Sequence, residues 1–387
     1  MDTHVTPGPR RGPRLSRRSL LGWSAAAAAA SGTTLLGAAT AHAAGAPATP
    51  GSGLLLDSPV VDLDDGSDPL IREKPLHNST VLQSFGFDNV NGRIYLAQVM
   101  EGGIQLPGET APVSGTDRSI RGDLCITRWD LSGNQLGSMY ARGLGHGVSF
   151  GVEPFGAGAY LWTEADAVPT SDGKSSRGQR LARFKFVDGA VVDSSSSALV
   201  KHTPVPGSTA NTASVDPVYG RLVHRYGTDG GMRYAVHDLD LARLGIWNAP
   251  LADIAEPAVT VPAQYGTPDF QGYAVAGRYL YLMHGNAYGT TQQIDLNGDG
   301  TAETVVVSPD GEGNTFLTSV DLGTGAILET RPTRAAYTLT YREPEGLAVQ
   351  VPSAADPATF RLCMGFASGD PGARQATIYV KDALVRP

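Results

Sequence analysis

Several polar side chains in this sequence could act as an acid, a base or an anion-binding group. Histidine can serve as a general base, arginine can neutralise a carboxylate or phosphate, and two carboxylic acids can cleave a glycosidic bond. His146 is the most distinctive, because the glycines of Gly143-Leu144-Gly145-His146-Gly147 would allow another strand or a ligand close to the backbone. The candidates for catalytic roles are His146, His284, Arg225, Arg342, Glu164 and Glu345.

A second set of residues could hold a ligand without reacting with it. Amides and imidazoles exchange hydrogen bonds with sugar hydroxyls, and aromatic rings offer platforms for the apolar faces of sugars. The alternative is that the polar members occur only where strand ends meet solvent. The candidate ligand-binding residues are Gln83, Gln98, Asn211, Gln271, Tyr160, Trp162, Tyr288 and His77.

The sharpest local motif is an acidic, glycine-containing segment that begins at Asp295. Its spacing of oxygen-bearing side chains matches the first part of an EF-type calcium loop, but position 12, where a bidentate Glu would stand, is Val306. Ca²⁺ could bind there, and an ordinary Asn/Asp/Gly turn is the alternative. The candidate metal ligands are Asp295, Asn297, Asp299, Thr301 and Glu303.

These residues fall at corresponding places in a strand pattern that recurs five times from His77 onward. A Gly-Arg corner between the first and second strands of a unit appears at Arg93, Arg221 and Arg278. Five antiparallel units without a helical period predict an all-β fold, a five-bladed β-propeller of four-stranded antiparallel blades. A two-sheet sandwich is the alternative, but it would not explain the repeated corner. The predicted first and second strands are 81–88 and 94–98, 147–153 and 159–164, 212–216 and 222–225, 271–276 and 279–284, and 345–351 and 360–366.

Propeller geometry would bring many of the candidates to one place. The first strand of each blade lines the central channel and the second runs antiparallel to it, so the start of one and the end of the other emerge on the same face. The sequence therefore predicts a concave ligand site at a polar mouth of the channel. Residues at first-strand starts are Gln83, His146, Asn211, Gln271 and Glu345, and residues at second-strand ends are Gln98, Glu164, Arg225 and His284.

Composition limits the classes of protein that this chain can belong to. Hydrophobic residues make up 41% of the 387 residues, which excludes wholesale disorder, and 48 Gly and 26 Pro favour many short elements. The net charge of −8 argues against a nucleic-acid partner. No nucleophile elbow, phosphate-binding glycine loop or dinucleotide fingerprint stands out. Cys125 and Cys363, the only cysteines, could form a disulfide or remain buried thiols, and two cysteines alone cannot make a zinc site.

The N-terminus is typical of an export signal. Ser16-Arg17-Arg18-Ser19-Leu20-Leu21 precedes a mildly apolar, uncharged run, and Ala41-His42-Ala43 fits a cleavage site. An uncleaved membrane anchor is the alternative, although Ala, Gly, Ser and Thr insert poorly. We therefore expect a twin-arginine signal peptide at 1–43, a leader at 44–76 that adds one outer strand, and the propeller domain at 77–387. The mature protein is expected to be secreted and monomeric, with no membrane span.

Several dispersed segments together resemble a known family. They are Phe85-Gly86-Phe87-Asp88, Gly122–Asp130, Gly145-His146-Gly147, Leu161-Trp162-Thr163-Glu164 and Arg342-Glu343-Pro344-Glu345-Gly346. Residues 77–387 resemble the TagC-like β-propeller family, which is shared by TagC proteins of teichoic-acid operons and receptor-binding proteins of certain phages. The resemblance implies a five-bladed propeller that contacts cell-wall glycopolymers. This chain differs from the phage members in its export signal and in lacking tail-attachment segments.

Three functions are consistent with these observations. The first is recognition of an anionic glycopolymer, teichoic-acid-like or uronate-containing, at the polar mouth. The second is a polysaccharide lyase or glycosidase, with Arg225 or Arg342 as the neutralising group, His146 or His284 as the base, or a carboxylate pair instead. The third is a wall-associated module for protein–protein interaction.

Overall fold

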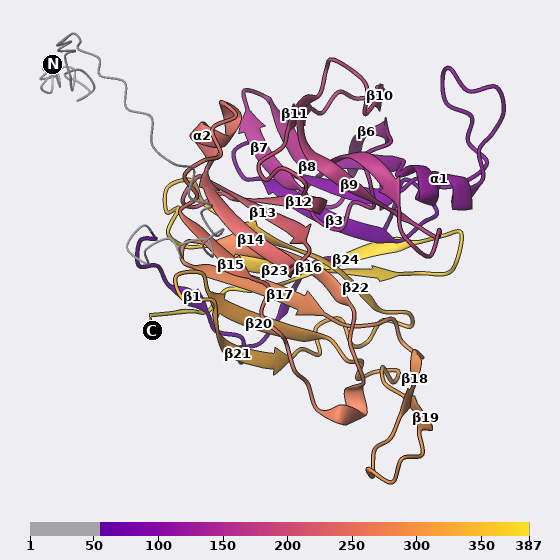
Figure 1. The fold of residues 1–387 in the computed structure, drawn as a ribbon, viewed down its shortest axis with the longest axis vertical. Helices are drawn as coiled ribbons and strands as arrows, with labels where there is room; N and C mark the ends of the chain where they lie inside the picture. Colours follow the sequence, from indigo (N-terminus) through magenta and orange to yellow (C-terminus); the bar gives the residue numbers. More distant parts are fainter. Residues whose placement is uncertain (1–54, 387) are drawn as a thin grey trace, which may run out of the picture. The chain divides into compact units, whose positions relative to one another are not determined.

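The computed structural model describes residues 55–386. The export signal predicted at 1–43 lies outside the described residues. Five antiparallel blades surround a central axis, which confirms the predicted five-bladed β-propeller (Figure 1). The first three blades, each from its inner to its outer strand, are β3 (Leu82–Asp88), β4 (Arg93–Val99), β5 (Leu124–Asp130) and β6 (Gln135–Arg142); β7 (Gly151–Phe155), β8 (Gly158–Pro169), β9 (Ser176–Lys185) and β11 (Val200–His202); and β12 (Thr209–Asp216), β13 (Arg221–Thr228), β14 (Gly231–Asp238) and β15 (Ala252–Ala255).

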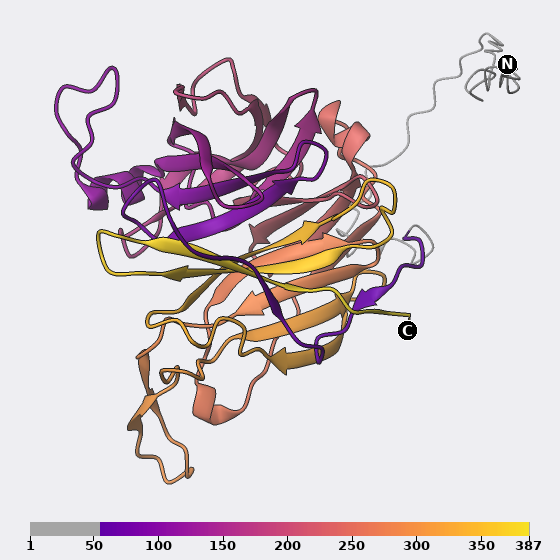
Figure 2. The same ribbon diagram turned by 180° about the vertical axis from the view of Figure 1, so that it is seen from behind.

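The last two blades complete the ring and join the two ends of the described chain. The fourth blade is β16 (Phe270–Ala276), β17 (Tyr279–His284), β20 (Phe316–Asp321) and β21 (Ala326–Pro332), and the fifth is β22 (Glu343–Gln350), β23 (Arg361–Ser368), β24 (Gln375–Lys381) and β2 (Asp68–Pro75). The outer strand β2 pairs antiparallel with β24, and the indigo N-terminal segment can be followed beside the yellow strands in Figure 2. Residues 68–75, which we had placed in the leader, are therefore a structural part of the fifth blade.

The ring closes because the five inner strands pack against one another in sequence order. β3 contacts β7, β7 contacts β12, β12 contacts β16, β16 contacts β22, and β22 contacts β3. Such crowding near the axis requires small residues, and a Cβ added at Gly86 would lie 2.7 Å from Val152 Cγ2 of the next blade. Apolar side chains such as Phe85, Phe150 and Leu347 line a small cavity between the inner strands of four blades, whose volume of about 20 Å³ leaves room for little more than one water molecule.

The recurring Gly-Arg corner has a specific structural basis. Asp216 ends the first strand of its blade and accepts hydrogen bonds from the backbone N–H groups of Val218 (2.9 Å) and Tyr219 (3.2 Å). Gly220 then adopts φ of +65°, a conformation that glycine reaches without strain. The second carboxylate oxygen of Asp216 accepts the N–H of Gly277 in the neighbouring blade at 2.8 Å. The corner therefore both turns the chain and joins adjacent blades.

Several short elements are additions to the predicted pattern. The strand β10 leaves the second blade and lies parallel to β6 in the first. The hairpin of β18 and β19 extends from the fourth blade, and β1 pairs with β25 near the C-terminal end of the described residues. No helix among residues 55–386 is long and apolar enough to span a membrane. The bounds are α1 (Gly115–Arg121), β10 (Val191–Asp193), α2 (Leu239–Arg243), η1 (Ala263–Tyr265), β18 (Thr291–Ile294), β19 (Glu303–Val306), β1 (Val60–Val61) and β25 (Leu384–Val385).

The two cysteines are buried and unpaired in the described structure. Cys125 lies in β5 of the first blade, and Cys363 lies in β23 of the fifth. Burial raises the pKa of the Cys125 thiol to about 12, so this group is not a reactive thiolate at neutral pH. Of the two alternatives left open by the sequence, the structure has the free thiols.

Candidate functional site

The strand registers place first-strand starts opposite second-strand ends. Leu82 pairs with Gln98, Thr212 with Arg225, and Phe270 with His284. We call the end of the propeller that bears these pairs the rim face. The candidates at first-strand starts and second-strand ends therefore share this face, although the side chains differ greatly in what they contact.

Two of the amide candidates are bound to neighbouring loops. Gln98 is fully buried, and its Nε2 donates to the backbone oxygen of Thr80 at 2.6 Å, while its Oε1 accepts the N–H of Asn78 at 3.2 Å. Asn211 is also fully buried, and its Oδ1 accepts from the Ser208 hydroxyl at 2.8 Å and lies 2.7 Å from His224 Nε2. Their polar atoms stabilise the loops around the channel and are not free to bind a ligand.

The other two amides have less extensive contacts. Gln271 is partly exposed and donates from Nε2 to the backbone oxygen of Gly285 at 2.8 Å. Gln83 is buried, and its one side-chain hydrogen bond among the described residues is a long contact of 3.4 Å to the Leu82 carbonyl. Of the four amides predicted to bind ligand, Gln271 is the one that solvent reaches.

Arg225 is already neutralised by a carboxylate of its own blade. Its Nε and Nη2 donate to Glu256 at 2.6 and 3.0 Å, and Nε also lies 3.1 Å from the Tyr234 hydroxyl. Its guanidinium carbon stacks 4.0 Å from the centre of the Phe270 ring. Because Arg225 already forms this bidentate ion pair, its predicted role as the neutralising group for a substrate carboxylate does not fit the structure.

Arg342 is enclosed within the protein. Its guanidinium is fully buried and donates to the carbonyls of Ala335 (2.8 Å) and Thr333 (3.2 Å) and to the hydroxyl of Thr315 (2.7 Å). Burial without a carboxylate partner lowers the pKa of Arg342 to about 10. Arg342 therefore secures the segment before β22, and the predicted contact with a substrate does not fit its position.

The two acidic candidates lie in blades that do not adjoin. Glu164 of β8 is fully buried and accepts the N–H groups of Gly147 (2.7 Å) and Gly178 (2.6 Å). Glu345 of β22 is 6% exposed and has no hydrogen-bond partner among residues 55–386. Burial raises the pKa of both carboxyl groups, and nearby Glu343 raises that of Glu345 further. This arrangement does not provide the facing carboxylate pair that a glycosidase requires.

The two histidine candidates are partly exposed and uncharged at neutral pH. His146 lies in the loop before β7, with its Nδ1 2.6 Å from the Ser175 hydroxyl, and burial together with the nearby Arg177 lowers its pKa to about 4. His284 ends β17 edge-on to Phe270, with ring centres 5.6 Å apart, and burial lowers its pKa. A base with a pKa near 4 is weak at neutral pH, so His146 is better suited to hydrogen bonding than to proton abstraction.

The predicted aromatic platforms are mostly covered. Trp162 is fully buried, its indole N–H donates to Glu153 at 2.8 Å, and no face of its ring is open to a sugar. Tyr160 lies under the guanidinium of Arg183, whose carbon is 3.6 Å from the ring centre. Tyr288 is partly exposed and donates its hydroxyl to the backbone oxygen of Tyr337 at 3.0 Å.

His77 lies outside the channel mouth. It is exposed in the segment between β2 and β3 and contacts the outer strand of the first blade, where its Nδ1 is 2.9 Å from Gln135 Nε2 and its Nε2 is 3.2 Å from the Ser138 hydroxyl. The structure therefore does not group His77 with the rim candidates.

Two polar residues next to His146 are absent from the sequence-based candidates. Ser175 and Arg177 lie at the tip of the β8–β9 hairpin, where both side chains are partly exposed. The sequence predicts that the second strand ends at Glu164 and that the third begins at Arg180, whereas β8 continues to Pro169 and β9 begins at Ser176. Ala165, Ala167 and Arg177 lie in this extension of the hairpin. Their pattern of apolar and polar residues is too weak to predict the extra strand residues from the sequence.

The predicted calcium ligands lie at the exposed tip of the β18–β19 hairpin. Asp295 Oδ2 accepts the N–H of Gly300 at 2.8 Å, and Asp299 Oδ1 accepts that of Thr301 at 2.7 Å, so these oxygens already close the turn. Within the described part of the chain, no three His, Cys, Asp or Glu side chains converge as a metal-binding group. Ca²⁺ at this loop stays a prediction. The segment concerned comprises Asp295, Asn297, Asp299, Thr301 and Glu303.

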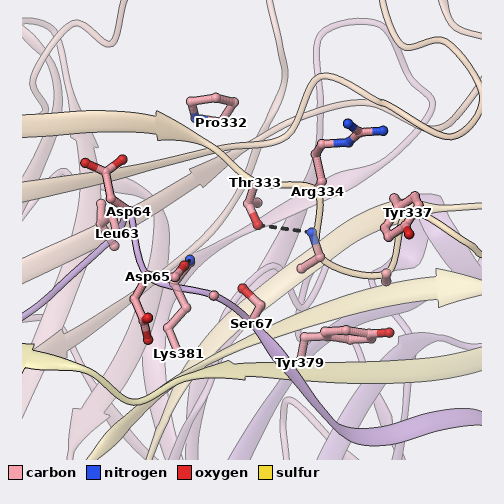
Figure 3. Close-up of a pocket in the computed structure, with 13 residues that line it drawn as sticks. Leu63, Asp64, Asp65, Ser67, Pro332, Thr333, Arg334, Tyr337, Tyr379 and Lys381 are labelled. Atoms are coloured by element: carbon pink, nitrogen blue, oxygen red, sulfur yellow. Dashed lines mark hydrogen bonds between the residues drawn. The ribbon is translucent and has the colours of Figure 1, made fainter.

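A cavity of about 520 Å³ lies between the outer parts of the fourth and fifth blades (Figure 3). Residues 63–67, residues 332–337, Tyr379 and Lys381 line it, and none of the sequence-based candidates does. Lys381 is buried and donates to the backbone oxygen of Asp65, and Asp64 forms an ion pair with Arg331 at 2.6 Å. Charges of both signs are therefore present at this cavity.

The fold and its rim face define a five-bladed β-propeller with partly exposed polar groups on one end. Residues 81–380 match the family described as the phage 5-bladed beta propeller receptor binding platform domain, and the chain belongs to this family. This result confirms the resemblance inferred from the dispersed motifs.

Two further comparisons agree with this assignment. The chain is 27% identical over 316 residues to the Bacillus subtilis (strain 168) protein named "Putative major teichoic acid biosynthesis protein C", a match that covers 80% of this chain and 61% of that protein's length. The tail fiber of Staphylococcus aureus phage P68 superposes with a TM-score of 0.56 at 16% identity, over 82% of this chain and 52% of the fiber chain. The second likeness shows a shared fold. The chain therefore spans little more than half the length of either protein.

Proposed function

We propose that this protein is a secreted β-propeller that recognises an anionic cell-wall glycopolymer on its rim face. The observation that carries the proposal is the membership of residues 81–380 in a family of receptor-binding platform propellers. The similarity to a protein named for teichoic acid biosynthesis supports an anionic wall polymer as the ligand. The twin-arginine motif in the N-terminal segment supports export to the compartment where such polymers occur.

The charge of the protein limits how such a ligand would be held. The chain carries a net charge of −8, so a polyanion is repelled by the molecule as a whole. Recognition then depends on a small number of local donors and cations, in contrast to a polycationic surface that binds any anionic polymer. Binding is therefore expected to be selective among anionic polymers.

The catalytic alternatives receive less support from the described geometry. A lyase needs an effective base beside an unpaired cation, whereas Arg225 is paired with Glu256, Arg342 is enclosed, and the pKa of His146, lowered to about 4, makes it a weak base. A glycosidase needs two carboxyl groups across one site, whereas Glu164 is committed to two backbone amides. Recognition of a glycopolymer requires neither a base beside an unpaired cation nor a pair of carboxyl groups across one site.

Sedimentation with purified Gram-positive cell walls tests the proposal. Walls that retain their teichoic acids are compared with the same walls after removal of these polymers by hydrofluoric acid. We expect the purified protein to sediment with the intact walls and to remain in solution with the stripped walls. Equal binding to both preparations, or binding to neither, would contradict the proposal.

A further inference from the structure

Arg177 on the rim face is reachable by solvent and is not paired with an acid of the described residues. Arg177 forms no ion pair with any carboxylate among residues 55–386 and is partly exposed. Its Nη1 donates to the Ser175 hydroxyl at 3.2 Å and to the backbone oxygen of Ser176 at 2.9 Å. Its Nε and Nη2 have no hydrogen-bond partner in the same part of the chain. These N–H groups remain available to an external acceptor.

Arg177, Ser175 and His146 form a continuous chain of polar contacts. Because Arg177 donates to the Ser175 oxygen, the single hydroxyl proton of Ser175 is free to point at His146 Nδ1, 2.6 Å away. The neutral imidazole then carries its own proton on Nε2. The pKa of His146, lowered to about 4 by burial and by Arg177, is consistent with this uncharged donor at neutral pH.

Glu164 fixes the relative position of the two segments that carry this cluster. One of its oxygens accepts the N–H of Gly147, next to His146, and the other accepts that of Gly178, next to Arg177. A Cβ at Gly145 would clash with the Glu164 carboxyl group, so the glycine-rich loop can close over it only because Gly145 has no side chain. The loop and the hairpin are therefore joined through one buried carboxyl group.

The helix α1 supports the same hairpin from its other side. The Ser176 hydroxyl donates to the backbone oxygen of Ser119 at 3.0 Å, and the Ser119 hydroxyl donates to the backbone oxygen of Lys174 at 2.9 Å. The turn before β9 and the first residue of β9 are thus held by hydrogen bonds to α1. Such support reduces the entropy lost when a ligand orders the binding groups.

We propose that Arg177 and His146, with Ser175 between them, bind an oxyanion of the acidic glycopolymer. The guanidinium supplies a charge and two N–H groups, and the imidazole supplies a neutral N–H donor beside it. A phosphodiester or a uronate carboxylate fits this donor set, because each presents charged oxygens that accept two or more hydrogen bonds. The inference rests on the proposed function, and it locates the contact on the second blade.

Isothermal titration of the purified protein with two polymers distinguishes the two sources of the oxyanion. Poly(glycerol phosphate) supplies phosphodiesters, and polygalacturonate supplies carboxylates. For whichever polymer binds, we expect Arg177→Gln to weaken the affinity by roughly tenfold or more and Ser175→Ala by a smaller factor. Arg177→Lys should recover part of the loss, because it restores the charge without the planar fork.

Arg180→Gln is the matched control, because Arg180 lies on the same strand with a side chain that is 51% exposed. We expect this variant to retain the wild-type affinity to within about twofold. Thermal unfolding of each variant separates lost binding from lost folding. An Arg177→Gln variant that folds and binds like the wild type would overturn the site and leave the proposed function standing, as would equal losses in Arg177→Gln and Arg180→Gln. Failure of the wild-type protein to bind either polymer would overturn both.

Discussion

Glu345 is an ionisable side chain whose burial is not offset by a counter-ion. It lies in the inner strand of the fifth blade, has no hydrogen-bond partner among residues 55–386, and is 6% exposed. Burial, and then the charge of Glu343, raise its pKa well above the ordinary value of 4.5. The native protein therefore holds the proton of Glu345 to a higher pH than the unfolded chain does.

This difference in proton binding leads to a prediction for Glu345→Gln. Because the folded pKa is raised, the native state gains stability from protonation at low pH and loses it as the pH rises above about 4.5. Glutamine has the same shape and no proton to lose, so the variant should be more stable than wild type by about 1–3 kcal/mol at pH 7. The advantage should disappear near pH 4, as measured by urea unfolding at both pH values. A variant that is destabilised at pH 7 would show that the charged carboxylate has a partner in the native state.

The sequence was sufficient to predict many of the side chains that lie on the rim face. It was not sufficient to predict which groups those side chains contact. Strand alternation and the repeated corner predict Gln98, Arg225 and Glu164 at second-strand ends; Gln98 lies next to the end of β4, whereas β13 and β8 continue beyond Arg225 and Glu164. Their partners come from loops or neighbouring blades that no local pattern identifies, such as Glu256 for Arg225 and Gly178 for Glu164. Whether a polar residue is free or internally bonded depends on such long-range contacts.

At the scale of elements, the strand β2 closes the ring. It is the outer strand of the fifth blade and pairs with β24, so the N-terminal part of the described chain completes a sheet made by its C-terminal part. Ile71 is 4% exposed and packs in a core cluster with Phe85, Trp129 and Ile378. The closure is therefore stabilised by burial as well as by backbone hydrogen bonds.

The closure predicts unequal effects of two similar substitutions. Ile71→Ala should lower the free energy of unfolding by about 2–4 kcal/mol, because it removes buried methyl groups and leaves a cavity at the junction. Leu328→Ala, in the outer strand of the fourth blade, should cost less than about 0.5 kcal/mol, because Leu328 is 47% exposed. Chemical denaturation of both variants measures the difference. Equal and small losses would mean that β2 contributes little to the ring.

Inner strands were easier to predict from the sequence than outer ones. Strands such as β3 are buried along their whole length between neighbouring blades, and their sequences are rich in apolar and small residues and are bounded by turns. Outer strands such as β11 and β15 have three or four residues and a weaker pattern, and β10 pairs with a blade other than the one that precedes it. Pairing between such short segments is set by the closed ring, so local periodicity does not reveal it.

For the molecule as a whole, the ring brings distant segments to one end while its narrow centre stays packed with apolar side chains. The cavity of about 20 Å³ between the inner strands is too small for a polymer, and we therefore expect a ligand on the rim face to lie across the end of the propeller. The cluster of His146, Ser175 and Arg177 lies on this end beside the second blade. The 520 Å³ cavity between the fourth and fifth blades is the competing location.

Hydrogen–deuterium exchange of the full protein, with and without the wall polymer that it binds, tests the location most directly. The account predicts slower exchange at residues 143–147 and 174–178, with no change at residues 63–67 and 332–337. Protection confined to the latter segments would place the ligand in the cavity between the fourth and fifth blades and contradict the account.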